Sequence, residues 1–372
     1  MAHVFGPHEL LEDVHQKGLC IGCGACVDLC PYFKTYRGKT SMLFPCTLSE
    51  GRCYAYCPKA EVDLDALSDN IYGTAYGSHP LGTYRHVVMA RAGKTMKTGP
   101  FQAGGTASAL MSFALASGLI DRAVLTDREG LIPVPRLAEH PDDVLQYAAS
   151  KYMAAPTIAM LNRAAGRGMN RMGVVGTPCQ VTAVAQMRSN PLKKVDFVDP
   201  MALVVGLFCT WALDTRALIS FLSARVDITE IRKMDIPPPP AEIFILETDK
   251  GAREIALDDI RPLVPGGCHI CPDMTAEWAD VAVGVLEGRP QWNTLIIRTE
   301  KGEALVEQAE KEGYLHTASM PEEKLAHLGT AAGNKKKRAL LRAREEGLLN
   351  VSGAGKRSAL RINETSLEKI IA

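Results

Sequence analysis

The stretch Cys20-Ile-Gly-Cys23-Gly-Ala-Cys26-Val-Asp-Leu-Cys30-Pro31 places four cysteines in the spacing C-x2-C-x2-C-x3-C-P. Three thiolates at this spacing can wrap one iron–sulfur cube, and the cysteine before the proline can then reach a second cube. A structural zinc ion is the alternative, but zinc takes four ligands, and seven of the eleven cysteines lie between residues 20 and 57. The stretch therefore predicts an N-terminal ferredoxin-like iron–sulfur module.

A second, imperfect cysteine run follows at residues 46–58. Its start and end match a second copy of the motif, but Ser49 stands where the second cysteine belongs. Crossed ligation, as in two-cluster ferredoxins, predicts a complete first site of Cys20, Cys23, Cys26 and Cys57. The second site is then one thiolate short, with Cys30, Cys46 and Cys53. It fits a three-iron cluster, a four-iron cluster with a serine, carboxylate or solvent ligand, or no cluster.

The composition describes an ordinary globular chain of 372 residues with 42 basic and 42 acidic side chains. A net charge of zero gives no overall field that would favour nucleic acid. The absence of a long apolar run predicts no membrane span. The first residues lack the basic and apolar regions of a signal peptide, which predicts a cytoplasmic protein. Because thiols stay reduced there, clustered cysteines indicate metal ligands rather than disulfides.

The remaining chain alternates predicted strands and helices, which is typical of an α/β (α+β) fold with a mixed sheet. Strands are predicted at 85–92, 123–126, 172–175 and 202–208. Helices are predicted at 106–117, 142–167 with a break at Pro156, 181–187, 215–224 and 303–312. We expect a ferredoxin-like [4Fe-4S] module at 1–67, a Gly- and Ser-rich linker at 68–82, a larger mixed-sheet flavin-binding domain at 83–320 and a helical basic C-terminal tail at 321–372.

Four further cysteines lie in the larger domain. Cys268 and Cys271 form a C-x2-C pair, and Cys179 and Cys209 each follow a predicted strand. Strand ends are where α/β domains assemble their sites. Four thiolates suffice for one cube, but Cys179 and Cys209 could equally be small buried apolar residues. Spacing alone leaves both interpretations open.

These motifs resemble the beta subunits of coenzyme F420-reducing hydrogenases and F420-linked dehydrogenases. The resemblance extends from about residue 81 to residue 349, and the ferredoxin-like segment looks like an N-terminal extension seen in some members. The motifs, in order, are GGT at 104–106, ASKY at 149–152, GTPCQ at 176–180, GLFC at 206–209, KMDI at 233–236, GGCHICPD at 266–273, AEWADVAVG at 276–284 and WNT at 292–294. The resemblance implies FAD and one four-iron cluster on Cys179, Cys209, Cys268 and Cys271.

The resemblance also implies flavin contacts. The expected FAD-binding residues are Gly104, Gly105, Thr106, Ser108, Lys151, Thr177 and Gln180. The glycine turn before a helix can offer N–H groups to a phosphate or flavin carbonyl, although an ordinary turn has the same pattern. Lys151 is expected near the pyrophosphate or the flavin N1 region, with a solvated lysine as the alternative. Because FAD carries the hydride chemistry, no side chain is assigned as catalytic.

Other polar residues are expected to be structural. Asp273 and Asp280 are expected to cap or brace the backbone. The basic run 335–338 is expected on a solvated helix face.

The implied function is that of an iron–sulfur flavoprotein electron-transfer subunit. Electrons would pass between a hydride carrier, coenzyme F420 in this family, and the iron–sulfur clusters. The clusters would lead to a catalytic partner subunit of formate dehydrogenase or hydrogenase type. The partners could extend to a larger electron-transfer complex. One alternative is a stand-alone FAD and iron–sulfur reductase of an organic substrate. Another is a ferredoxin-like connector without a working flavin site.

Ser49→Cys tests the crossed ligation of the second site. If Cys30, Cys46 and Cys53 share one cluster, the new thiolate completes a four-cysteine set and the iron content rises. Iron analysis and electron paramagnetic resonance of the anaerobically reconstituted chain provide the measurement. Unchanged iron and an unchanged spectrum would count against this ligation.

Overall fold

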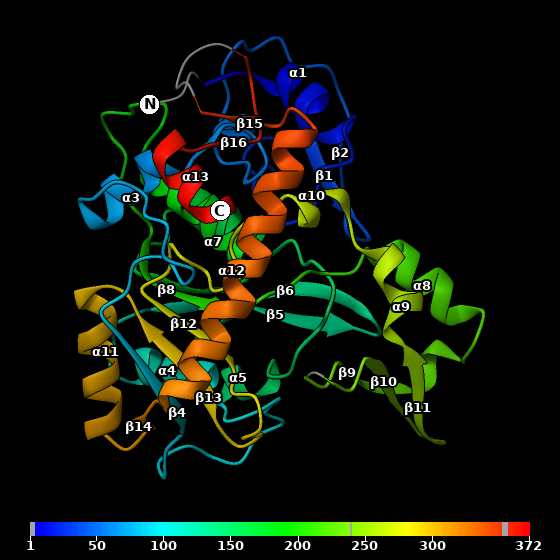
Figure 1. Ribbon diagram of the computed structural model, residues 1–372, viewed down its shortest axis with the longest axis vertical. Coiled ribbons are helices and arrows are strands. Elements are labelled where there is room, and N and C mark those ends of the chain that lie inside the picture. The colour runs from blue at the N-terminus through cyan, green and yellow to red at the C-terminus, as the bar shows by residue number, and fades with distance from the viewer. Residues whose placement is uncertain (1–3, 239, 352–355) are drawn as a thin grey trace.

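An eight-stranded mixed sheet forms the centre of the computed structural model, which describes residues 4–238, 240–351 and 356–372 (Figure 1). The strands in spatial order are β14 (Leu315–Ser319), β4 (His86–Ala92), β13 (Asn293–Ile297), β12 (Val281–Val285), β8 (Met201–Leu207), β7 (Met172–Gly176), β5 (Arg122–Glu129) and β6 (Ile132–Ala138). The strands predicted from the sequence are confirmed, each within a few residues. The α/β class is confirmed with them.

The four central strands β12, β8, β7 and β5 run parallel, whereas the outer pairings are antiparallel. Val174 lies opposite Val124 and Val204 in this register, and all three are buried. A parallel sheet needs cover on both faces, which explains why its strands are apolar on both sides. Their carboxyl ends meet at one edge, where chains of this class place their sites.

Different parts of the chain cover the two faces. One face carries α4 (Thr106–Ala116), α5 (Pro141–Gln146) and α11 (Glu300–Lys311). The other carries α6 (Thr157–Gly166) and α7 (Pro178–Arg188), together with the N-terminal module and the long α12 (Glu322–Glu345). The predicted helix at 142–167 is only partly right. Residues 147–156 are not helical, and Ala149 and Tyr152 adopt positive φ, so the break is longer than Pro156 alone requires.

The N-terminal module packs directly on the sheet face rather than forming a separate unit. It consists of α1 (Pro7–Leu10), the π-helical turn η1 (Leu11–His15), the hairpin β1 (Phe33–Tyr36) and β2 (Lys39–Met42), α2 (Arg52–Ala55), β3 (Val62–Asp63) and α3 (Leu64–Tyr72). Gly24 has φ of 85°, and a Cβ there would lie 2.8 Å from the Pro156 carbonyl oxygen. Glycine is therefore required for this close approach.

Asn162 on α6 fastens the cysteine loop to the large domain. Its buried Nδ2 donates to the carbonyls of Ala25 at 3.0 Å and Val27 at 2.8 Å. The Ile158 N–H donates to the Cys23 carbonyl at 3.2 Å. The first cysteine motif is therefore held by the helix that precedes β7.

The expected linker and tail need correction. Residues 68–72 belong to α3, and Tyr76 within the supposed linker is buried. The C-terminal segment continues through β15 (Leu349–Asn350), β16 (Leu360–Arg361) and α13 (Glu364–Ile371). β16 pairs with β3 of the N-terminal module, and Arg361 forms a buried ion pair with Glu61. Apolar contacts between the two ends override what local composition suggests, so both ends share one core.

A smaller unit lies to the side of the sheet (Figure 1). It contains α8 (Thr215–Ser223), η2 (Ile228–Glu230), the antiparallel strands β9 (Ile231–Asp235), β10 (Ile243–Thr248) and β11 (Gly251–Ala256), α9 (Leu257–Ile260) and η3 (Arg261–Leu263). The short α10 (Gly266–His269) follows and returns the chain to the centre. Within the described residues, no helix is both long and apolar enough to cross a membrane.

Asn162→Ala should loosen the N-terminal module. It leaves buried carbonyls without a donor, which should lower the free energy of unfolding by about 2 to 4 kcal/mol. Chemical denaturation of the full chain measures the change. Asn334→Ala, at an exposed position of α12, is the matched control and should cost about 0.5 kcal/mol or less. Equal losses of stability in the two variants would contradict the proposed role of Asn162 in holding the cysteine loop.

Candidate iron–sulfur and flavin site

The four thiols predicted for the first N-terminal group lie near one another in the fold. Burial raises the pKa of Cys26, and Cys57, Cys23 and Cys20 around it raise that pKa further. Burial likewise raises the pKa of Cys57 to about 12. Because metals bind thiolates, filling such a site releases protons from these thiols. The end of the second motif therefore meets the start of the first, as crossed ligation requires.

The second group consists of Cys30, Cys46 and Cys53. Burial raises the pKa of Cys53 to about 11, with a contribution from the two other thiols of the group. Ser49 lies exposed in the loop between Cys46 and Cys53. The group is therefore assembled with three thiols, and it lies at the more exposed end of the module.

The third group combines elements that are distant in sequence. Cys179 lies in the first turn of α7, Cys209 follows β8, and Cys268 lies on α10 shortly before Cys271. Burial raises the pKa of Cys179 to about 12, with further contributions from Cys271 and Cys268. Burial also raises the pKa of Cys209, and the same thiols add to this effect. Cys179 and Cys209 are thus members of a thiol group rather than isolated apolar residues.

The three groups form a row. Cys23 of the first group interacts electrostatically with Cys179 of the third. On the other side, Cys26 interacts with Cys53 of the second group. The buried Lys59 opposes the rise in the pKa of both Cys57 and Cys179, so it lies near the first and third groups. In the part of the chain that the structure describes, no three His, Cys, Asp or Glu side chains converge on the position of a single metal ion.

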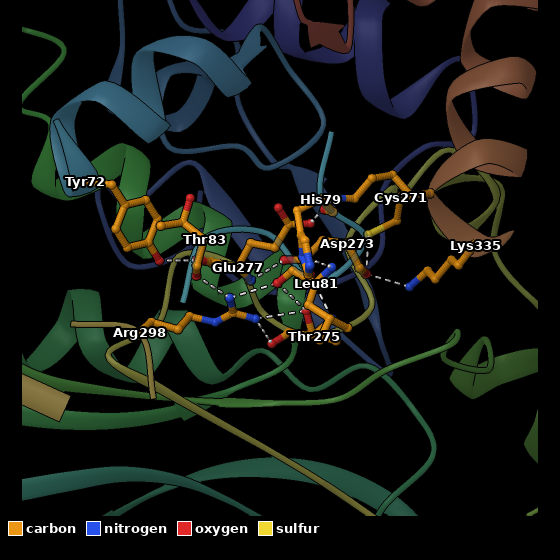
Figure 2. Close-up of polar contacts among 11 residues, drawn as sticks. Tyr72, His79, Leu81, Thr83, Cys271, Asp273, Thr275, Glu277, Arg298 and Lys335 are labelled. Atoms are coloured by element: carbon orange, nitrogen blue, oxygen red, sulfur yellow. Dashed lines mark hydrogen bonds and ion pairs between the residues drawn. The ribbon is translucent and has the colours of Figure 1, made fainter. Parts of the chain in front are cut away.

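A buried polar network supports the third group (Figure 2). The Asp273 carboxylate accepts the backbone N–H groups of Thr275 at 2.9 Å and Glu277 at 2.8 Å. Arg298 donates to the Leu81 and Thr275 carbonyls, each at 2.9 Å. These bonds shape the loop that follows Cys271.

Asp280 is also structural. It accepts the Val204 N–H at 2.9 Å and the Thr299 hydroxyl at 2.9 Å. The expectation that Asp273 and Asp280 brace the backbone is confirmed.

The basic run at 335–338 is not the solvated face that was expected. Lys335 and Lys336 are buried on α12, and Lys336 forms an ion pair of 3.0 Å with the buried Glu277. The Lys335 ammonium donates to the carbonyls of Cys209 and Asp273. A helical wheel with apolar residues at 332, 339, 340 and 343 could have indicated that this face points inward.

The expected flavin residues around Gly104 lie at the carboxyl end of β4. Gly105 has φ of 76° and precedes α4. The Thr106 N–H is already bound by Asn293 Oδ1 at 3.2 Å, whereas its buried hydroxyl has no partner among the described residues. Ser108, two residues further along α4, is half-buried. The orphaned Thr106 hydroxyl fits a polar ligand atom at this turn.

Lys151 is committed to its own loop. Its ammonium donates to the carbonyls of Tyr147, Ala148 and Ala149 at 2.6, 3.2 and 2.8 Å. Burial lowers its pKa to about 8. In this arrangement Lys151 braces the loop, and a role toward a pyrophosphate stays a prediction.

Thr177 and Gln180 serve the third cysteine group. The Thr177 hydroxyl lies 3.2 Å from Cys179 Sγ, and Gln180 Oε1 accepts the Thr177 N–H at 2.9 Å. Gln180 Nε2 donates to the Ala155 carbonyl at 2.8 Å. This capping box begins α7 and orients Cys179, which fits a hydrogen bond to a cluster ligand.

Comparison with known proteins agrees with this arrangement. Residues 87–162 and 169–323 match the N-terminal and C-terminal parts of the coenzyme F420 hydrogenase/dehydrogenase beta subunit, and residues 14–32 match a 4Fe-4S binding domain. The chain belongs to the coenzyme F420 hydrogenase/dehydrogenase beta subunit family. The match at 14–32 confirms an iron–sulfur module ahead of the domain that defines the family. The relatives with a named activity are oxidoreductases or their subunits.

Individual relatives cover most of the chain. An uncharacterized protein of Methanocaldococcus jannaschii is 30% identical over 82% of this chain and 91% of its own length. The coenzyme F420 hydrogenase beta subunit of Methanococcus voltae is 29% identical over 72% of this chain and 98% of its own length. A chain of the xenon-derivatized F420-reducing [NiFe] hydrogenase complex of Methanosarcina barkeri superposes with a TM-score of 0.66 at 28% identity, covering 72% of this chain and 93% of that one.

Two of the family-like segments meet in a polar cluster that the sequence did not predict. Gln102 donates to Asp235 at 2.7 Å, and the Tyr152 hydroxyl donates to the same carboxylate at 2.7 Å. Tyr152 belongs to the ASKY segment and Asp235 to the KMDI segment. The occurrence of both motifs in the sequence was the only signal that these residues belong to one site. The cluster joins the loop after β4 to the loop before α6 and to β9.

Lys151→Met should change how stability depends on pH. With a folded pKa of about 8 against an ordinary 10.5, the unfolded chain binds more protons between these values. The unfolding free energy of the unmodified chain should therefore rise through this window relative to the variant, by on the order of 2 kcal/mol. Denaturation at pH 7.5 and 10.5 measures it. Lys301→Met, at an exposed position, should show no such difference, and parallel curves for Lys151→Met would refute the prediction.

Proposed function

We propose that this chain is an iron–sulfur flavoprotein subunit that passes electrons between reduced coenzyme F420 and a catalytic partner subunit of formate dehydrogenase or hydrogenase type. The observation that carries this proposal is the row of three cysteine groups. Cys179 raises the pKa of Cys23, and Cys53 raises that of Cys26, so the first group neighbours both of the others. A row of this kind suits electron transfer from the sheet edge to the surface of the N-terminal module.

Each group has an assigned role in this proposal. The third group, Cys179, Cys209, Cys268 and Cys271, would hold a four-iron cluster, and so would the first, Cys20, Cys23, Cys26 and Cys57. The second group offers three thiols and fits a cluster with one non-cysteine ligand or three irons. Three cysteines of the first group, Cys23, Cys26 and Cys57, are buried, whereas the four cysteines of the third group are half-buried.

FAD would be bound at the carboxyl edge of the sheet. It would take up the two electrons of one hydride together and pass them on one at a time. Thr106 supports this placement with its unpartnered buried hydroxyl. Gly105 and Ser108 complete the turn at the start of α4. Thr177 and Gln180 orient Cys179 of the third group.

Cys268→Ser tests the proposed order. The variant should lose the signal of one cluster while the N-terminal clusters remain. The rate at which reduced coenzyme F420 reduces those clusters should fall. Loss of a residue that only supports a metal ligand typically costs roughly 10- to 100-fold in activity, and loss of a ligand itself should cost more. Electron paramagnetic resonance and flavin absorbance, recorded anaerobically on the full chain, follow both ends of the row.

Cys30→Ser is the matched control. It removes a thiol of the outermost group, so the first and third clusters should still be reduced. Loss of every cluster in Cys268→Ser, or undiminished reduction of the N-terminal clusters, would contradict the proposed order. A wild-type chain with full iron and sulfide but no flavin would favour the ferredoxin-like connector instead.

A further inference from the structure

Lys335 is a buried cation at the third cysteine group. It lies on α12, is 5% exposed, and donates from Nζ to the Cys209 carbonyl at 2.6 Å and the Asp273 carbonyl at 2.7 Å. The Asp273 carbonyl oxygen also lies 3.7 Å from Cys271 Sγ (Figure 2). The ammonium is therefore fixed at the backbone that carries two of the four thiols.

The charge of Lys335 has no carboxylate partner, whereas that of its neighbour does. Lys336 pairs with Glu277 at 3.0 Å. Among the residues that the structure describes, no Asp or Glu forms an ion pair with Lys335. The Asp273 carboxylate, the acid that acts on it at longer range, is engaged by two backbone N–H groups. Burying an ammonium without a close counter-charge costs several kcal/mol, so an anion is expected beside it.

The thiols of the third group are the groups that can supply this anion. Cys271, Cys209 and Cys268 each interact electrostatically with Lys335. A cluster held by thiolates carries negative charge and gains one more on reduction. In a poorly solvated interior, a fixed positive charge at this point stabilises the reduced form more than the oxidised one.

We infer that Lys335 is a positioning residue that compensates the charge of the cluster held by Cys179, Cys209, Cys268 and Cys271 and raises its reduction potential. The inference rests on the proposed function, since it assumes that the third group holds the cluster. It assigns α12 a role in setting the driving force for electron transfer to the first group. The direction of net flow along the row then depends on a residue far from every ligand in sequence.

Lys335→Gln tests this on the full chain, reconstituted anaerobically with iron and sulfide. Glutamine keeps an amide donor for the two carbonyls but removes the charge. A redox titration followed by electron paramagnetic resonance should show the equilibrium constant for reduction of one cluster falling about tenfold, which is about 59 mV for a one-electron couple. The midpoints of the N-terminal clusters and the iron content should stay unchanged. Lys335→Met, which removes charge and donors together, should shift the same midpoint in the same direction.

Two controls separate charge from packing. Lys335→Arg keeps the charge and should restore the wild-type midpoint. The double change Lys336→Gln with Glu277→Gln removes a neutral pair one position along α12 and should leave the midpoint in place.

The outcomes distinguish the inference from the function on which it rests. An unchanged midpoint with full iron in Lys335→Gln overturns the inference while leaving the proposed function intact. Equal loss of this cluster from the Gln, Met and Arg variants shows a purely structural role and also overturns it. If every cluster signal of the unmodified chain is still present in Cys268→Ser, the third group holds no cluster. That result would overturn both the proposed function and this inference.

Discussion

The structure depends on bringing three groups of cysteine thiols together where the N-terminal module meets the large domain. Bare thiols can be buried as small apolar groups, but thiolates cannot be buried without metal or positive charge beside them. The N-terminal module packs on the large domain and does not form a separate unit. Its cysteine loop lies against α6, where Asn162 binds the loop carbonyls, and this contact brings Cys23 next to Cys179.

Positive charge is buried along the same row. Lys59 lies near the first and third groups, and Lys335 donates to the Cys209 carbonyl in the third. Lys336, next to Lys335, is instead paired with Glu277. Arg298 donates to the carbonyls of Leu81 and Thr83. The large domain is thus covered by α12, which carries two lysines, Lys335 and Lys336, into the core, whereas charged residues such as Arg338 and Arg342 are exposed.

Much of the fold could be read from local patterns. The strands at 172–175 and 202–208 and the helix at 215–224 have periodicities that burial imposes directly on their residues. The expected linker at 68–82 and tail at 321–372 failed for the opposite reason. Small polar residues and a run of lysines indicate solvent in an isolated segment, but contacts from distant residues bury Tyr76 and Lys335. For Tyr76 no periodic pattern indicates this burial, whereas for Lys335 the apolar positions 332, 339, 340 and 343 of the same helix could have indicated it.

The sequence by itself predicted the two N-terminal cysteine groups, because the reach of a thiolate around a cluster restricts ligand spacing and proline turns the last ligand away. It also determined the family, through motifs that occur in order, and the third group was predicted from that resemblance. Only the tertiary structure showed that the first group neighbours both others and that Lys59 and Lys335 lie near these thiols. It alone showed that Gln102, Tyr152 and Asp235 meet. Those relations join residues that are far apart along the chain, and they arise only when the sheet, the N-terminal module and α12 pack together.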